Sequence, residues 1–234
     1  MMETLREFDA RVELFQTNSV PDEAEFGLPE SLQKKVSPRD GVLLPFHGAT
    51  VAYFLDGQAR ELVGMLADDL HAQFGGSLSV PLPLAMAHVT LHDLHASPEL
   101  RTVRQMMMNS AKPVADLVAQ ARDIGSIQTT CTAVFNMMNT SVVIGVRAAD
   151  EGEHRKLFAA RALFDTLVPS GPFTPHITIA YYRPAAPTPL SPNEFRQALS
   201  ACTAKVHGKP VLLAPERLHA LHFDSMGNYW VVRP

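Results

Sequence analysis

Cysteine is scarce in this sequence. Its 234 residues include only Cys131 and Cys202, and neither belongs to a C-x-x-C motif. A disulfide framework or a thiolate metal site needs more cysteines or closer spacing. We therefore expect both thiols to be small, buried core residues rather than nucleophiles or ligands.

Long apolar runs are also missing. No window approaches the roughly 18 apolar residues that a membrane span needs. Residues 1–16 mix Glu, Arg and Asp with apolar residues and lack the apolar core of a secretory leader. The chain is 46% hydrophobic and 19% charged, with a mean hydropathy of +0.01, which is typical of globular proteins. We expect a cytoplasmic protein with no membrane partner.

There is no excess of positive charge. Lys and Arg total 20 against 24 Asp and Glu, so the formal net charge is −4. Binding to long duplex nucleic acid is therefore not expected, and a nucleic-acid substrate should be small or presented as an end. The sequence also lacks a Gly-rich phosphate loop, a dinucleotide fingerprint and a nucleophile elbow, which excludes the enzyme classes that depend on them.

Residues 1–45 have little regular pattern. Their start is compatible with a short helix, but the rest is interrupted by Pro21, Gly27, Pro29, Pro38 and Gly41. We predict an N-terminal extension over residues 1–45 and one larger domain over residues 46–234.

Within the larger domain, the order strand, helix, strand occurs twice. Apolar spacing and β-branched content predict the first unit at residues 50–55, 59–74 and 87–91, and the second at residues 141–146, 151–168 and 175–180. The two repeats extend over about residues 48–95 and 127–182.

The remaining pattern completes the fold prediction. A helix is expected at residues 98–120 despite Pro113, a further strand at 127–135, a helix at 193–204 and a closing hairpin at about 216–233. This mixture predicts an α+β fold, two-lobed and internally duplicated, with largely antiparallel sheets around a central cleft.

Each repeat ends in the same short motif. The sequence reads His88-Val-Thr90-Leu in the first unit and His176-Ile-Thr178-Ile in the second. Alternate side chains of a strand share a face, so each histidine lies about 6.6 Å along the strand from its threonine, on the same side. Random order would give roughly 0.1 such triplets with apolar neighbours, and two occur at equivalent points.

A single strand histidine is more often structural than catalytic, but two symmetric copies favour function. An inward-facing imidazole needs a polar partner, and a duplicated core would more simply use apolar residues. Imidazole titrates near neutrality, so one ring can act as general base and the other as general acid. The threonine hydroxyls can donate to phosphate oxygens. The two histidines are near-equivalent in the repeat, so the pattern assigns neither role to either ring.

Paired His-x-Thr motifs in a duplicated α+β chain resemble the two-histidine (2H) phosphoesterase superfamily, which includes cyclic phosphodiesterases and proteins called 2′-5′ RNA ligases. The resemblance covers about residues 46–234, and it carries the catalytic roles to His88, Thr90, His176 and Thr178. The segment 218–232, with Ser225, Gly227 and Tyr229, looks like the family's closing strand pair.

The resemblance implies a metal-independent phosphodiesterase without a cofactor. Its substrate would be a small nucleotide or an RNA end, with a 2′,3′-cyclic phosphate as the expected scissile group. Residues 1–45 and the insert at 98–128 make this chain larger than a minimal member and could cap the groove. The alternatives are a non-catalytic nucleotide or RNA-end binder and an RNA-joining activity through 2′-5′ linkages. The pattern predicts neither a physiological substrate nor an oligomeric state.

Metal binding is the alternative interpretation of the histidine residues. His88, His92 and His95 cluster in sequence, but on a strand the first two would be about 13 Å apart, too far for one zinc ion. His219 and His222 would lie on opposite faces of their strand. We therefore expect no metal.

Four further residues are candidate substrate contacts. Tyr182 would share a face with His176 if the strand continues regularly, and could stack on a base. Phosphate binding often uses a guanidinium fork. The additional candidates on these grounds are Tyr53, Arg147 and Arg183.

Overall fold

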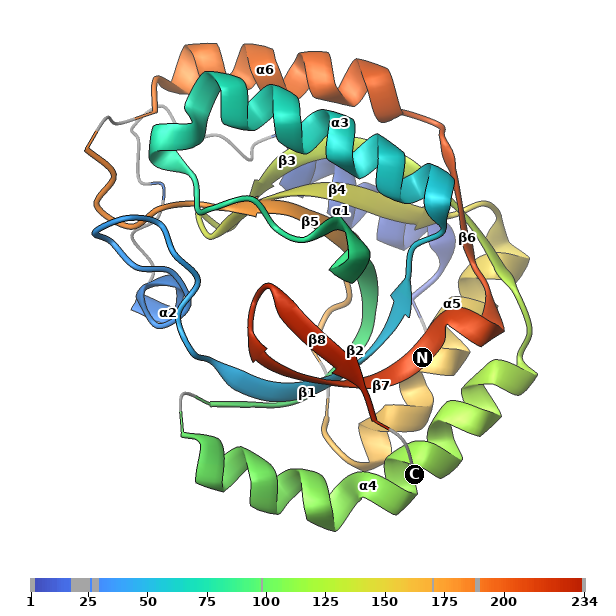
Figure 1. The fold of residues 1–234 in the computed structure, drawn as a ribbon. Helices are drawn as coiled ribbons and strands as arrows, with labels where there is room; N and C mark the ends of the chain where they lie inside the picture. Colours follow the sequence, from blue (N-terminus) through green and yellow to red (C-terminus); the bar gives the residue numbers. More distant parts are fainter. Residues whose placement is uncertain are drawn as a thin grey trace.

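The computed structural model describes residues 3–17, 26, 30–97, 99–169, 171–187 and 190–232. The described residues form one eight-stranded, curled sheet in which all neighbouring strands are antiparallel (Figure 1). The predicted α+β class is thereby confirmed. The strands follow the order β6 (Pro210–Leu213), β3 (Ile127–Met137), β4 (Ser141–Ala148), β5 (His176–Tyr181), β2 (His88–Ser97), β1 (His47–Phe54), β7 (Leu218–Ser225) and β8 (Asn228–Val231).

The strand–helix–strand unit is present twice. The first unit is β1, α3 (Gly57–Phe74) and β2, and the second is β4, α5 (Glu151–Ala162) and β5. Both helices begin at an aspartate cap, because Asp56 accepts from the Ala59 amide at 2.8 Å and Asp150 accepts from the Glu153 amide at 2.9 Å. Such caps satisfy amides that the first turn leaves unpaired. The last strands of the two units, β2 and β5, are neighbours at the centre of the sheet.

Helices cover both sides of the sheet. Figure 1 shows α3 beside α6 (Pro192–Val206) over β3, β4 and β5, with α4 (Leu100–Asp123) along the other side. The core alternation predicted for the two motifs is present, because Val89, Leu91, Ile177 and Ile179 are each at most 1% exposed. None of the described helices has both the length and the apolar composition that a membrane span needs.

The N-terminal residues pack onto this domain. Leu5, Phe8 and Val12 of helix α1 (Leu5–Thr17) form an apolar cluster with Phe158 of α5. After α2 (Glu30–Gln33), Val36 pairs with Leu43 in an isolated bridge and is buried in the main core. Residues on both sides of position 45 therefore share one core, and the division of the chain there stays a prediction.

Candidate active site

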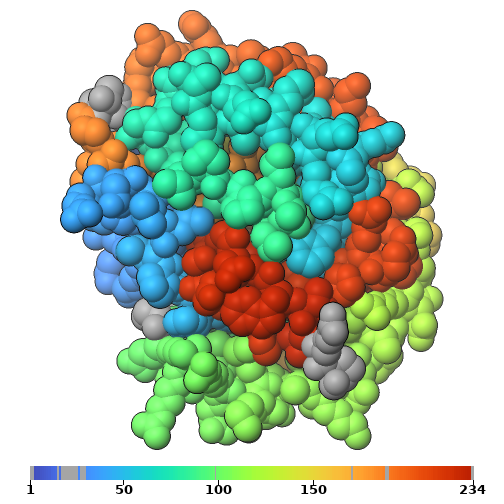
Figure 2. Space-filling model, viewed as in Figure 1, coloured from blue at the N-terminus to red at the C-terminus, as the bar shows by residue number. Residues whose placement is uncertain are grey.

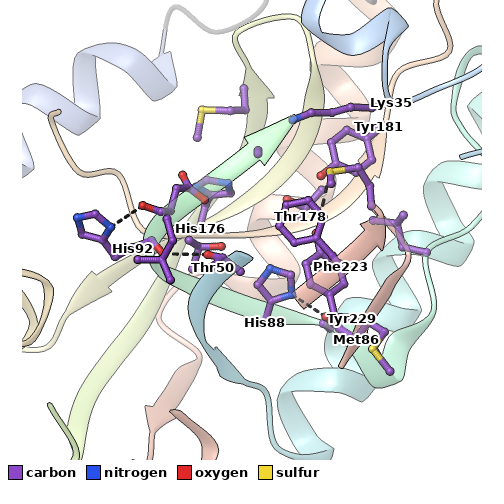
Figure 3. A pocket seen from close by; sticks show the side chains of 18 of the residues that line it. Lys35, Thr50, Met86, His88, His92, His176, Thr178, Tyr181, Phe223 and Tyr229 are labelled. Atoms are coloured by element: carbon purple, nitrogen blue, oxygen red, sulfur yellow. Dashed lines mark hydrogen bonds between the residues drawn. The ribbon is translucent and has the colours of Figure 1, made fainter. Parts of the chain in front are cut away.

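Both His-x-Thr motifs line one cleft of about 980 Å³. Figure 3 shows His88, His176 and Thr178 around this pocket, with Tyr181, Phe223 and Tyr229 on one side. Figure 2 shows the closing hairpin (red) between the segment leading into β1 (blue) and the loop after α3 (green). These segments are in contact, because a Cβ added at Gly227 would meet Leu43 and Pro83. Parts distant in sequence thus enclose the cleft.

The register of the sheet arranges the motif residues as a quartet. Strands β2 and β5 pair at Val89 and Ile177. In an antiparallel pair this register sets His88 across from Thr178 and Thr90 across from His176. The two histidines are then diagonal neighbours, roughly 7–8 Å apart at the backbone. Two rings at this spacing can reach the same phosphate from either side.

Each imidazole is held by the carbonyl two residues before it. The Nδ1 atom of His88 lies 2.7 Å from the Met86 oxygen, and that of His176 lies 2.8 Å from the Thr174 oxygen. A carbonyl only accepts, so Nδ1 carries the proton in both rings. The bare Nε2 of the neutral ring is therefore left for the chemistry.

Both histidines are neutral in the free cleft at pH 7. Burial lowers the pKa of His88, and the hydrogen bond to Met86 raises it by less. A charge on His176 would lower the His88 pKa further, because two cationic rings repel each other. Burial likewise lowers the pKa of His176, against the smaller effect of its bond to Thr174. The site therefore starts with a competent base and favours at most one added proton.

Tyr181, and not Tyr182, faces the cleft. The β4–β5 register shifts between Val142 and Val143, so the regular alternation breaks after Thr178. This bulge turns Tyr181 into the cleft and turns Tyr182 into the core, where it is 0% exposed. The expectation that Tyr182 shares the face of His176 is corrected accordingly.

The other three candidate contacts also lie away from the cleft lining. Tyr53 is 1% exposed in the core, and burial raises its pKa to about 12. Arg147 forms a two-pronged ion pair with Asp9 of α1, at 2.6 and 2.7 Å. Arg183 donates to the backbone oxygens of Pro38 and Arg39. These side chains are committed to packing or to structural hydrogen bonds.

Two tyrosines supply hydroxyl donors to the cleft. The pKa of Tyr181 is raised to about 12, mainly by burial and also by the charge of Asp93, against the opposing effect of a hydrogen bond with Thr178. Burial also raises the pKa of Tyr229, whose ring centroid lies 4.8 Å from that of His88. Both phenols stay protonated at neutral pH and can donate to an anionic substrate. Tyr229 belongs to the closing strand pair expected from the resemblance, whereas the bulge that exposes Tyr181 has no signal in the sequence.

Two cationic side chains line the cleft that the sequence did not single out. Arg161 of α5 donates to the Leu91 oxygen at 2.5 Å and lies 4.2 Å above the Phe173 ring. Lys35, from the segment between α2 and β1, lies 4.9 Å from the Phe46 ring centroid. Neither position belongs to a motif, so only the fold reveals them.

Asp93 is the acidic residue of the lining. Register shifts on both sides of it break the alternation of β2, so Asp93 faces the cleft together with Thr90. Its charge raises the pKa of both motif histidines, although by less than burial lowers them. It therefore favours a ring that has taken up a proton.

The neighbouring His92 is structural. It is 1% exposed, with Nδ1 at 2.6 Å from the Asp93 backbone oxygen and Nε2 at 3.2 Å from Asp165. Within the described part of the chain, no three His, Cys, Asp or Glu side chains come together as a metal would require. The absence of a resident metal stays a prediction.

Comparison with known proteins gives a fold but no family. No protein-family model matches the sequence, and no curated protein matches it. The conserved protein of unknown function ATU0111 from Agrobacterium tumefaciens is similar in structure, with a TM-score of 0.62 and 13% identity over 91% of this chain and 93% of that chain. This likeness shows that the two chains share a fold.

Two smaller proteins are more distantly similar. The protein TT0787 of Thermus thermophilus gives a TM-score of 0.49 and 20% identity, over 80% of this chain and 95% of that chain. E. coli LigT, solved with NADP+, gives 0.48 and 19%, over 81% of this chain and 95% of that chain. The assignment of chemistry therefore depends on the cleft itself.

Proposed function

We propose that this protein is a metal-independent phosphodiesterase that opens a 2′,3′-cyclic phosphate on a small nucleotide or an RNA end. The observation that carries this proposal is the matched pair of rings. Each has Nδ1 tied to a backbone carbonyl two residues earlier, and both line one cleft with a threonine beside them. Acid and base on opposite sides of a phosphate are what cleavage of a diester requires.

The reaction would proceed with one histidine neutral and the other protonated. The neutral Nε2 accepts a proton from water as the water oxygen bonds to phosphorus. The protonated Nε2 of the other ring donates its proton to the ribose oxygen as that P–O bond breaks. The product is a ring-opened 2′- or 3′-monophosphate, and proton exchange with solvent restores both rings.

The remaining polar groups of the cleft would stabilise the transition state. Thr90 and Thr178 lie beside the two rings and can donate to the non-bridging oxygens, where charge is held during transfer. Tyr181 is hydrogen-bonded to Thr178, so it can orient that hydroxyl or donate directly. Arg161 adds a positive charge at the same cleft.

The test is hydrolysis of cyclic and linear nucleotide phosphodiesters in the presence of EDTA. His88→Ala and His176→Ala should each lower the rate at least about 10²-fold, and the double variant should lose little more than either single one because the rings act as a unit. His207→Asn is the matched control, since His207 is exposed and outside the cleft lining.

The outcomes separate the competing functions. A rate that survives both histidine substitutions would sink the proposal, and a rate abolished only by EDTA would move it to metal catalysis. Binding of cyclic nucleotides without turnover would identify a non-catalytic binder. Joining of RNA ends in a ligation assay would identify the reverse activity.

A further inference from the structure

The cleft continues from His88 along a row of aromatic rings. The centroid of Tyr229 lies 4.8 Å from His88 and 5.2 Å from Phe223, and Phe223 stacks on Phe46 at 6.4 Å with an interplanar angle of 14°. All of these residues line the cleft. We call Tyr229, Phe223 and Phe46 the aromatic wall. The three rings are packed together in one apolar cluster and are each only 8–9% exposed, so they offer the cleft a narrow apolar surface that a base or ribose can contact.

Lys35 stands at the far end of the aromatic wall. Its ammonium lies 4.9 Å from the Phe46 centroid, and Figure 3 shows it across the pocket from His88. The side chain is half-buried, and burial lowers its pKa. Within the described chain, no hydrogen bond or ion pair joins the ammonium to another side chain. A desolvated charge without a partner is costly, and a bound anion would offset that cost.

The other charges of the cleft do not fill this role. Asp93 acts on Lys35 through its field, but it forms no described ion pair with it and is itself exposed. Arg161 is already engaged, because it donates to the Leu91 oxygen and lies above the Phe173 ring. Lys35 is thus the cleft cation whose hydrogen-bonding capacity is left for a ligand.

We infer that Lys35 and the aromatic wall form a second subsite that binds an anionic group distinct from the scissile phosphate. The preferred substrate is accordingly a nucleotide that carries a second phosphate, with its base or ribose against the aromatic wall. An ammonium group serves such a phosphate as a point charge. The position of the scissile phosphate in this inference rests on the proposed function.

The test compares two substrates that differ by one phosphate: adenosine 2′,3′-cyclic phosphate with and without a 5′-phosphate. The wild type should show a kcat/KM at least about 10-fold higher for the 5′-phosphorylated form. Lys35→Met keeps an apolar stem over Phe46 without the charge, and should bring this ratio close to one. Lys35→Arg should retain part of it. Lys34→Met is the matched control, because Lys34 is an exposed neighbour that pairs with Glu30.

An unchanged ratio in Lys35→Met would overturn the subsite, and so would an equal loss for both substrates, since Lys35 would then serve the scissile phosphate. Calorimetry with adenosine 3′-monophosphate and adenosine 3′,5′-bisphosphate separates this inference from the proposed function. If the bisphosphate binds more tightly in a Lys35-dependent manner but neither cyclic nucleotide is hydrolysed, the subsite is supported and the phosphodiesterase is refuted. If the cyclic nucleotides are hydrolysed but Lys35 confers no preference for the 5′-phosphorylated form, the phosphodiesterase is supported and the subsite is refuted.

Discussion

The two histidine motifs share their local geometry but differ in what supports it. In the first half, the Met86 carbonyl that holds His88 belongs to a 3-10 turn, closed by bonds from Met86 N to Pro83 O (2.9 Å) and from Ala87 N to Leu84 O (3.1 Å). In the second half, Arg11 of α1 donates to the Phe173 oxygen at 2.8 Å and to the Thr174 hydroxyl at 3.2 Å.

The two halves therefore share the carbonyl–imidazole geometry and differ in the contacts that support it. One ring is held by its own loop, and the other depends on a helix from the N-terminal residues. Arg11 is in turn held by Glu3, through two bonds of 2.8 Å. The carbonyl–imidazole contact of His176 therefore depends on a hydrogen bond from α1, whereas the backbone hydrogen bonds that close the turn before His88 are local.

The largest effect on kcat is expected from removal of the motif hydroxyls, Thr90 and Thr178. The two halves of the molecule should differ least in this respect. Thr90→Val and Thr178→Val each remove one donor at nearly constant shape, and each should lower kcat about 10²-fold. Thr178→Val should have the larger effect, because it also removes the hydrogen bond between Thr178 and Tyr181. Steady-state kinetics with a cyclic nucleotide measure this. A rate that falls only for Thr90→Val would mean that one half alone binds the phosphate.

A smaller and asymmetric effect is expected from Arg11→Ala. Loss of the guanidinium should loosen the 173–174 loop and lower kcat about 10-fold, as for a misplaced catalytic group. In NMR spectra the ring nitrogens of His176 should shift while those of His88 stay in place.

The matched control for Arg11 is Arg147→Ala, which breaks another polar anchor of α1, the pair with Asp9, without touching the loop. Equal shifts at both histidines, or equal rate losses in the two arginine variants, would show that α1 acts only through general stability.

The smallest effect should appear in stability against pH. Both motif histidines have pKa values lowered by burial, so the unfolded chain binds more protons below about pH 6.5. Their contribution to stability is complete above that pH and is lost as pH falls through the folded-state pKa values.

The double variant His88→Asn/His176→Asn should therefore lose less Tm between pH 7 and pH 5 than the wild type, as scanning calorimetry would record. His88→Asn and His176→Asn alone should each show a loss of Tm between that of the wild type and that of the double variant. If the wild type and the double variant lose the same Tm, the histidines are not desolvated in the folded protein.

Much of the fold could be predicted from patterns of spacing, because period-two alternation and helical apolar spacing are local properties. Val89 and Ile177 are buried as the alternation requires, and His88 and His176 line the cleft. The residues that escaped prediction depend on non-local events. A bulge in β5 decides between Tyr181 and Tyr182, and Lys35 reaches the cleft only because the segment before β1 folds back over it.

The pairing of β1 with β7 has a consequence for synthesis of the chain. Gly48 of β1 lies opposite Phe223 of β7. Both histidine motifs precede β7 in the sequence, so a nascent polypeptide that has not yet reached β7 already contains them. It lacks Phe223 and Tyr229 of the aromatic wall, and one edge of β1 remains open to pairing with other chains. The last hairpin is therefore the element that covers this edge and protects it from premature association during translation.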